Sequence, residues 1–152
     1  MARRRKRILD IVQFKELLQD RGYRVTRQRL AVHTAMLTLG HASADEVLEH
    51  IEDRQKGIKA SPSSVYNILS DLADMGLYNR IRGFGGRIVF DVNPGRHIHL
   101  YDTKTQTFKD FEDDELAAMI DAQLKTRTFR GYRLDRFDLH LICHPSRKKK
   151  VQ

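Results

Sequence analysis

The first half of the chain carries alternating helix-start and helix-stop residues, which restrict the folds that it can adopt. Apolar residues at helical spacing predict four helices, over residues 8–20, 26–39, 43–53 and 61–75. Three of these helices begin with a hydroxyl residue that suits an N-cap, namely Thr26, Ser43 and Ser61. Residues that end helices follow at Gly22, Gly40 and Gly76.

A β-hairpin is expected after the fourth helix. Residues 77–82 and 87–91 read as two short strands, and the glycine-rich segment G-F-G-G joins them. Several helices followed by a hairpin are typical of a winged helix-turn-helix. In that arrangement the fourth helix enters the major groove of DNA, so residues 1–92 are predicted to form a DNA-binding domain with a basic N-terminal arm.

A second, smaller domain is predicted beyond the segment Asn93-Pro94-Gly95, which breaks regular structure and suits a hinge. Strand-like alternation in H-I-H-L-Y and Q-T-F-K-D-F is followed by a helical pattern over 113–128 and an alternating stretch over 132–143. A unit of this size, 96–152, cannot bury both of its faces alone. We therefore expect an α+β protein whose C-terminal α/β domain dimerises and carries a basic tail.

Composition excludes several classes of protein. The 152 residues are 40% hydrophobic, which is enough for a core, and the sequence has no apolar run long enough to cross a membrane. The N-terminus lacks the apolar stretch of a signal peptide, so we expect a cytoplasmic protein. The single cysteine, Cys143, excludes an intramolecular disulfide framework and a zinc site built from four cysteines.

The net charge of +8 comes from two basic runs, residues 3–7 and 147–150, while the remaining bases nearly balance the 20 acids. Such arms commonly contact nucleic acid phosphates, although solvated tails or a membrane-surface patch have the same composition. A third basic segment, residues 21–29, contains no acidic residue. It contains Arg21, Arg24, Arg27 and Arg29.

Five side chains of metal-ligating types form a candidate metal shell: His41, Asp91, His97, His99 and Asp110. His97 and His99 alternate, so both imidazoles point to one face if this segment is a strand. Three neutral imidazoles and two carboxylates suit Fe(II), Mn(II) or Zn(II) better than Ca²⁺ or Mg²⁺. The alternative is a set of surface or interface histidines without a metal. Of the other histidines, His33 is expected to be a packed or capping residue of the second helix, and His140 could join a second metal site.

The fourth predicted helix has a polar face suited to reading base edges. Val65, Ile68, Leu69 and Leu72 would face a core, which leaves an outward set on the other side. That set contains Ser63, Ser64, Tyr66, Asn67 and Ser70. Tyr66 could contact a thymine methyl, and Arg24, Arg27 and Arg29 could contact phosphates or the minor groove. An ordinary amphipathic core helix is the alternative interpretation.

Five motifs occur in a fixed order: V-T-R-Q-R-L-A-V (25–32), H-A-S-A-D-E-V (41–47), S-S-V-Y-N-I-L (63–69), L-A-D-M-G-L (72–77), and V-F-D followed by H-I-H (89–99). Together they resemble the ferric uptake regulator superfamily over about residues 14–143. The resemblance implies a dimeric, metal-dependent bacterial transcription regulator with a winged helix and a C-terminal dimerisation domain. It also implies that the five candidate ligands hold the regulatory metal between the two domains.

Details within the motifs resemble particular branches of the family. Aspartate at Asp91 and Asp110, where the iron repressors more often have glutamate, is similar to the peroxide-sensing and iron-response branches, and so is V-Y-N at residues 65–67. The family's structural zinc uses paired cysteines, and Asp102 and Thr105 occupy the first pair's positions here. We expect one divalent metal per subunit, Fe(II) or Mn(II) and possibly Zn(II), with no structural zinc. The haem-binding Cys-Pro dipeptide is also absent, because His144 follows Cys143.

The predicted function is a homodimeric, non-enzymatic transcription regulator that binds palindromic double-stranded DNA under metal control. It would sense iron or manganese status or peroxide, and whether it represses or activates is left open. Rival interpretations are a DNA-coating protein without metal control, a zinc-occupied regulator of the same family, and a non-haem iron oxygenase. The helical first half argues against the oxygenase, which would need a barrel of many strands.

Overall fold

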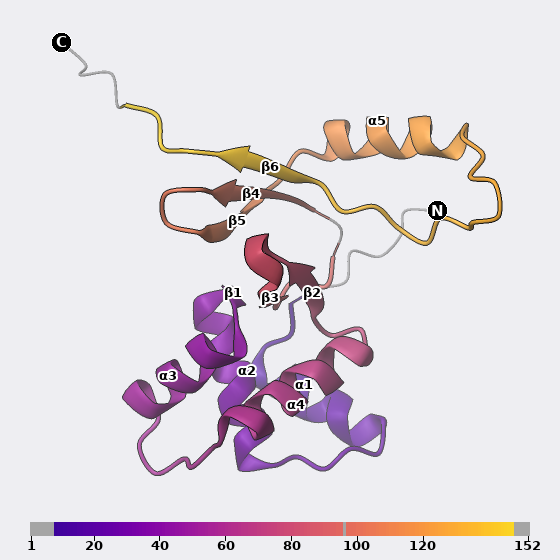
Figure 1. The fold of residues 1–152 in the computed structure, drawn as a ribbon. Coiled ribbons are helices and arrows are strands. Elements are labelled where there is room, and N and C mark those ends of the chain that lie inside the picture. Colours follow the sequence, from indigo (N-terminus) through magenta and orange to yellow (C-terminus); the bar gives the residue numbers. More distant parts are fainter. Residues whose placement is uncertain (1–7, 96, 148–152) are drawn as a thin grey trace. The chain divides into compact units, whose positions relative to one another are not determined.

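The chain forms two compact units, Met1–Gly95 and Arg96–Gln152 (Figure 1). The computed structural model describes residues 8–95 and 97–147, so the basic runs at the termini lie largely outside the described part. The boundary follows Asn93-Pro94-Gly95, the segment expected to act as a hinge. In the described ranges, no helix is both long and apolar enough to cross a bilayer.

Four helices build the first unit: α1 (Ile11–Asp20), α2 (Arg27–Leu39), α3 (Ala44–Arg54) and α4 (Pro62–Asp74). The expected caps are confirmed, since the side chains of Thr26, Ser43 and Ser61 accept backbone hydrogen bonds at the starts of α2, α3 and α4. The expected start of the first helix at residue 8 is wrong. Asp10 caps α1 instead, because its side chain accepts from the Gln13 amide while the Gln13 side chain accepts from the Asp10 amide.

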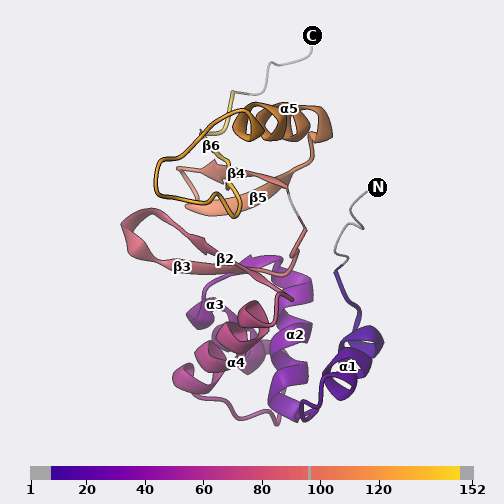
Figure 2. The ribbon, with the colours of Figure 1, turned by 90° about the vertical axis from the view of Figure 1, so that its right-hand side faces the viewer.

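Three short strands form the sheet of the first unit. They are β1 (His41–Ala42), β2 (Asn79–Arg82) and β3 (Ile88–Asp91), in the antiparallel order β1-β3-β2. The expected hairpin is present as β2 and β3, which lie above α3 and α4 in Figure 2. Between them, Phe84–Gly86 forms a 3-10 turn in which Gly85 has a positive φ of 77°. β1 was not predicted, because two residues are too few to show strand alternation.

The core of this unit lies between the helices and one face of the sheet. Apolar side chains from every helix and from β3 are buried in one cluster. The largest are Phe14, Leu18, Met36, Ile51, Leu69, Leu72 and Phe90. Val65, Leu69 and Leu72 come from α4, as its apolar spacing predicted, so the opposite face of that helix is left to solvent.

A buried imidazole joins four segments of the first unit. His33, on α2, is 2% exposed and stacks on Phe14 of α1 at 4.1 Å between ring centroids. Its Nε2 lies 2.7 Å from the carbonyl oxygen of Leu9, and its Nδ1 lies 2.6 Å from the hydroxyl of Tyr78. A carbonyl can only accept, so Nε2 carries the proton and Tyr78 donates to Nδ1. Of the two expected roles of His33, packing or capping, the packed one is confirmed.

The second unit has a three-stranded sheet and one helix. The strands are β4 (Ile98–Asp102), β5 (Thr107–Phe111) and β6 (His140–Cys143), and the helix is α5 (Asp114–Lys125). β4 is central, with β5 antiparallel on one side and β6 parallel on the other. The expected cap Asp113 is confirmed, because its side chain accepts from the Leu116 amide at 2.9 Å.

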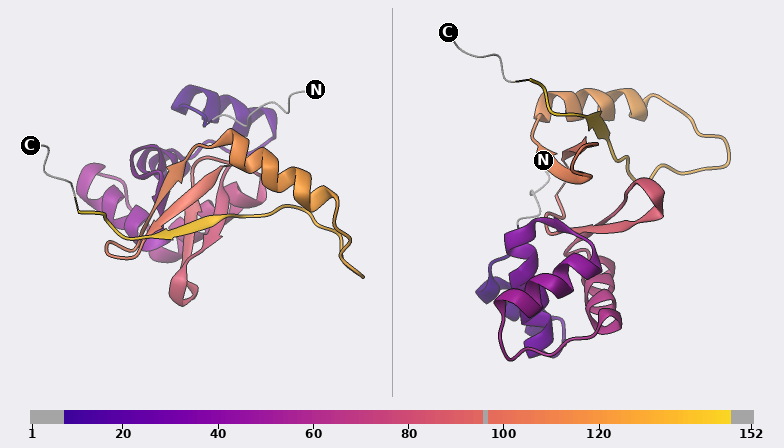
Figure 3. Two further views of the ribbon diagram at one scale, coloured as in Figure 1. Left: turned by 90° about the horizontal axis from the view of Figure 1, so that it is seen from above. Right: turned by 60° about the vertical axis from the view of Figure 1, so that its left-hand side comes forward.

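The expected last strand over 132–143 is too long. Only residues 140–143 pair as strand β6, and a long segment without helix or strand connects α5 to it, as both views in Figure 3 show. β4 is five residues long and therefore offers too few backbone partners for a twelve-residue strand. Gly131, with a φ of 79°, turns the chain before the alternating residues.

The neutral state of His33 should make the stability of the first unit depend on pH. Burial lowers the pKa of His33 below its ordinary value of 6.5. The unfolded chain therefore binds the proton more readily, so the stabilisation is complete above pH 6.5 and is lost as pH falls towards the lower folded pKa. We expect the free energy of unfolding to fall between about pH 7.5 and about pH 5.5 by more in the wild type than in His33→Gln.

Urea denaturation of the metal-free protein at the two pH values measures this difference. The exposed His144 offers a control, since His144→Gln should follow the wild-type pH profile. Equal losses in the wild type and His33→Gln would show that His33 does not cause the acid sensitivity.

Candidate functional site

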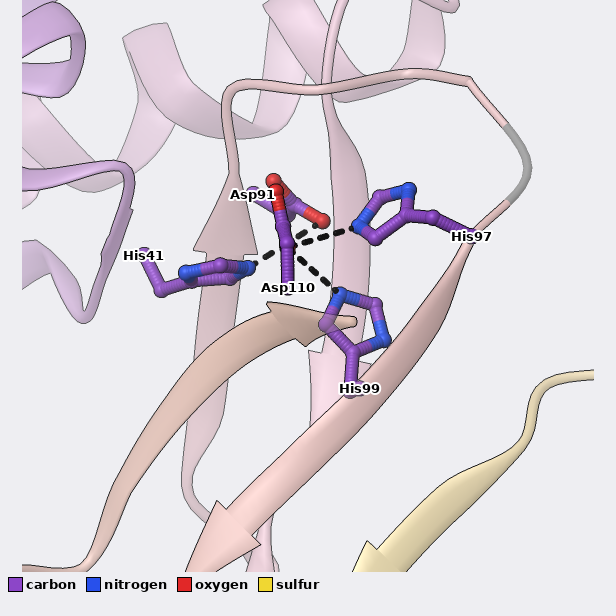
Figure 4. Close-up of side chains that lie close together, drawn as sticks. All are labelled: His41, Asp91, His97, His99 and Asp110. Carbon is purple, nitrogen blue, oxygen red and sulfur yellow. Dashed lines mark ion pairs between the residues drawn. The ribbon is translucent and has the colours of Figure 1, made fainter. Parts of the chain in front are cut away.

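One imidazole and one carboxylate face each other across the β1–β3 pair of the first unit. His41 and Asp91 are directly opposed in the register. Their Nε2 and Oδ2 atoms are 3.4 Å apart, and the Asp91 side chain is 1% exposed (Figure 4). The other carboxylate oxygen, Oδ1, accepts from the Asn93 amide at 2.9 Å. This hydrogen bond fixes the carboxylate and leaves Oδ2 directed at His41.

A second group has the same construction within the second unit. His99 on β4 and Asp110 on β5 are directly opposed in an antiparallel register. His97 lies two residues before His99, just outside the strand, and its ring lies 4.3 Å from the His99 ring between centroids. Asp110 Oδ1 lies 2.9 Å from His97 Nε2 and 3.6 Å from His99 Nε2 (Figure 4). The expected alternation of the two imidazoles towards one face therefore brings both to the same oxygen.

The spacing within each group fits ligands that share a metal ion. Two atoms that are each about 2.1 Å from one metal lie about 3.0 Å apart at an octahedral angle and about 3.4 Å apart at a tetrahedral angle. The three imidazole–carboxylate distances in the two groups run from 2.9 to 3.6 Å. All three imidazoles present Nε2, and the donors are the imidazole and carboxylate groups that Fe(II), Mn(II) and Zn(II) accept.

His140 lies next to the second group. It opposes His99 across the parallel β4–β6 pair, with the ring centroids 5.5 Å apart, and it also contacts Phe108. Burial, and then the charge that His99 can carry, lower the pKa of His140, so its imidazole is neutral near physiological pH. The ring packs against a candidate ligand from the side opposite Asp110.

The outward face of α4 is where the sequence placed base-reading side chains. Tyr66 is 41% exposed and contacts Phe90 edge-on, and Asn67 and Ser63 are also exposed. Ser64 has a structural task, because its hydroxyl donates to the Ser61 carbonyl and accepts from the Ser61 amide at 3.0 Å each. The sequence pattern does not predict this capping box, because the usual signature has glutamate or glutamine three residues after the capping residue and this chain has Ser64 there.

Among the basic residues near α2, Arg24 and Arg27 are exposed, whereas Arg29 is half-buried. The Arg29 guanidinium donates to the Arg24 carbonyl at 2.6 Å and stacks over the Tyr23 ring. Arg29 therefore holds the turn before α2, and Arg24 and Arg27 present their charges to solvent.

Two arginines that the sequence motifs do not single out hold the hairpin in place. Arg80 donates to the Ser70 carbonyl and hydroxyl at 2.8 Å and pairs with Asp74 at 2.8 Å, all on or beside α4. Arg87 donates to the Ser43 hydroxyl at 2.8 Å and pairs with Glu46 at 3.3 Å at the start of α3. These contacts join residues far apart in sequence, which local patterns do not reveal.

The comparisons with known proteins agree with this architecture. The model of the ferric uptake regulator family matches residues 20–142. The ferric uptake regulation proteins of Neisseria meningitidis are 25% identical over 137 residues, covering 87% of this chain and 92% of theirs.

Solved structures share the fold. The ferric uptake regulator of Vibrio cholerae has a TM-score of 0.70 at 24% identity, covering 87% of this chain and 99% of that one. A zinc-bound manganese uptake regulator has a TM-score of 0.65 at 27% identity, covering 87% of this chain and 98% of that one. With the family match extending over most of its length, this chain belongs to the ferric uptake regulator family.

Proposed function

We propose that the protein is a metal-dependent transcription regulator whose five candidate ligands bind one divalent cation. The observation that supports this is the pair of imidazole–carboxylate groups, one in each unit, at strand positions in direct register. Asp91 and His97 are separated by only five residues, so the chain limits the distance between them to roughly 20 Å. The linker is short enough for both groups to reach a single ion.

The two units become tied to each other when His41 and Asp91 share a cation with His97, His99 and Asp110. Two carboxylates neutralise a divalent cation while the imidazoles remain uncharged, which suits Fe(II) or Mn(II), with Zn(II) as the alternative. A ligand shifts a conformational equilibrium only by its differential affinity, and a site divided between two units favours the form in which they are held together.

The second unit supports the proposal of a homodimer. Its described residues bury only three large apolar side chains, Ile98, Tyr101 and Phe108. Six others in the unit are at least 36% exposed: Phe111, Met119, Phe129, Tyr132, Leu134 and Ile142. A unit with so small a core is marginal by itself, so association through it stabilises the fold. A two-fold dimer would present two α4 helices to two half-sites of a palindromic operator.

Metal binding is therefore expected to raise the affinity for operator DNA. The Asp91→Asn substitution should weaken the binding of the metal. The amide keeps the hydrogen bond from Asn93 but loses the charge, so we expect metal affinity to fall at least about tenfold. Titration calorimetry with Mn(II) measures the metal affinity, and fluorescence anisotropy with labelled promoter DNA measures the coupling.

Asp102→Asn is the matched control, because Asp102 is a half-buried carboxylate on the same strand as His99 and caps a turn by accepting from the Lys104 and Thr105 amides. It should leave metal affinity unchanged. DNA binding that is equally tight with and without metal would favour the DNA-coating protein instead.

The exposed face of α4 and the segment before α2 should contribute differently to DNA binding, the first to sequence discrimination and the second to affinity for any DNA. Tyr66→Ala is expected to reduce discrimination between operator and unrelated DNA by about 1 kcal/mol or more, because it removes contacts to base edges. Arg27→Ala should weaken binding to all sequences and lower the salt slope by about one. Affinities measured at several salt concentrations on both DNAs separate these effects. If Tyr66→Ala discriminates between operator and unrelated DNA as well as the wild type does, α4 is not the helix that reads the DNA sequence.

Within this function, we propose peroxide sensing at the iron-loaded site. Aspartate at both carboxylate positions and imidazoles held close to a carboxylate support it. Exposure of Fe(II)-loaded protein to peroxide should add one oxygen atom to His41 or His97, which peptide mass spectrometry detects. The neighbouring His140 is the internal control and should stay unmodified. Unmodified ligands together with iron-dependent DNA binding would indicate an iron-response regulator.

A further inference from the structure

Strand β1 is too short to hold itself firmly against β3. It consists of two residues, and the pairs His41 with Asp91 and Ala42 with Phe90 join it to β3. An isolated pair of strands is at best marginally stable in water, and so short a pairing needs further support. The position of His41, which offers one imidazole to the candidate metal site, therefore depends on what fixes the chain at the two ends of β1.

Each end of β1 is attached to a residue next to β3. At the first end, the Val92 amide donates to the Gly40 carbonyl at 3.0 Å. At the second end, Nη2 of Arg87 donates to the hydroxyl of Ser43 at 2.8 Å. The Arg87 carbonyl accepts from the Gly83 amide at 2.8 Å, so the hairpin fixes the backbone that carries this side chain. One attachment is thus made by the backbone and the other by side chains.

The Ser43 hydroxyl uses all of its hydrogen-bonding capacity. It donates to Glu46 Oε2 at 3.2 Å, and it accepts from the Glu46 amide at 3.4 Å and from Arg87. A hydroxyl has one donor and two acceptor positions, and all three are occupied here. Because Ser43 is only 5% exposed, losing one of these partners would cost free energy. The arrangement therefore holds Ser43, and with it the end of β1, in one position.

Glu46 completes the arrangement with its second carboxylate oxygen. Oε2 accepts from the Ser43 amide at 2.8 Å in the capping box of α3, while Oε1 lies 3.3 Å from Nη2 of Arg87. The Arg87 and Glu46 side chains are about half exposed, so their ion pair alone contributes little. Together with the buried hydroxyl, it joins the hairpin, the end of β1 and the start of α3. We call Ser43, Glu46 and Arg87 the β1 clamp.

We propose that Arg87 is a positioning residue of the candidate metal site, which holds His41 in place through the β1 clamp. The inference rests on the proposed function and adds to it a residue outside the five candidate ligands. His41 is two residues from Ser43 along the chain, and tight binding needs ligands held within about 0.5 Å of the productive geometry. Without the clamp, β1 separates from β3 more often, and His41 then moves away from Asp91.

Two substitutions in the full-length protein break the clamp from opposite sides. Arg87→Gln removes the guanidinium, and Glu46→Gln removes the negative charge while glutamine can still form the capping box. In each variant we expect the dissociation constant for Mn(II) to rise roughly 3- to 10-fold. Because both substitutions act on the same contact, their effects should not multiply in the double variant. Titration calorimetry measures these affinities.

Matched controls and a ligand variant show whether the effect passes through His41. Arg82→Gln removes an exposed positive charge from β2 of the same hairpin, and Asp45→Asn removes an exposed acid from the first turn of α3. Both should bind Mn(II) as the wild type does. In the His41→Ala background, Arg87→Gln should leave the remaining affinity unchanged, because the ligand that Arg87 positions is no longer there.

Amide hydrogen exchange of the metal-free protein gives a second readout. The Val92 amide donates across the end of β1, so it should exchange roughly 3- to 10-fold faster in Arg87→Gln. The amide of Leu69, a fully buried residue of α4, should exchange at the wild-type rate. Equal acceleration at both amides would show a general loss of stability and would contradict a positioning role.

Other results would also overturn the inference. If the wild type and Arg87→Gln bind Mn(II) equally well, the clamp does not position His41, while the proposed function stands. If Arg87→Gln weakens Mn(II) binding equally with and without His41, Arg87 acts on another part of the site. A lower salt slope for DNA binding at unchanged Mn(II) affinity would make Arg87 a phosphate contact instead. A wild type that binds no Mn(II) would contradict the proposed function itself.

Discussion

The arrangement of the candidate site depends on strand register. In the β1–β3 and β4–β5 pairs, the backbone hydrogen bonds place an imidazole and a carboxylate directly opposite each other. Opposed residues in an antiparallel pair have Cβ atoms about 4.5–5.5 Å apart, so the two side chains meet whatever the rest of their surroundings. The ladder therefore organises each group before any ion binds, and the side chains need little further ordering to coordinate one.

The two units differ in how many apolar side chains they bury, and the proposed function uses this difference. The first unit buries a large apolar cluster and ties its segments together through His33, Arg80 and Arg87. The second unit has a small core and an uncovered helix. The first unit can thus be a rigid module, while the second has little core of its own. In the proposed function, DNA binding would be controlled through the unit with the smaller core.

Local signals predicted most of the elements, and the misses have physical causes. The caps at Thr26, Ser43, Ser61 and Asp113 act within one helical turn, so the sequence reveals them. β1 exists only because β3 lies beside it. β6 begins only at His140 because its parallel partner β4 begins at Ile98, and neither fact can be read from the local sequence pattern. The H-x-H alternation placed two candidate ligands on one face without further information. The pairing of His41 with Asp91 needed the family resemblance, because the two residues are distant in sequence.

β1 is only two residues long, which limits the insertions and deletions that the sequence can accept next to it. Gly40 ends α2 with a positive φ of 71°, and its carbonyl accepts from the Val92 amide at 3.0 Å, which pins the chain on both sides of the His41–Asp91 pair. Side chains of a strand alternate between faces, so adding or deleting one residue between α2 and β1 would turn His41 away from Asp91. Related sequences should therefore accept insertions in the long segment before β6 and keep the length between α2 and β1 constant.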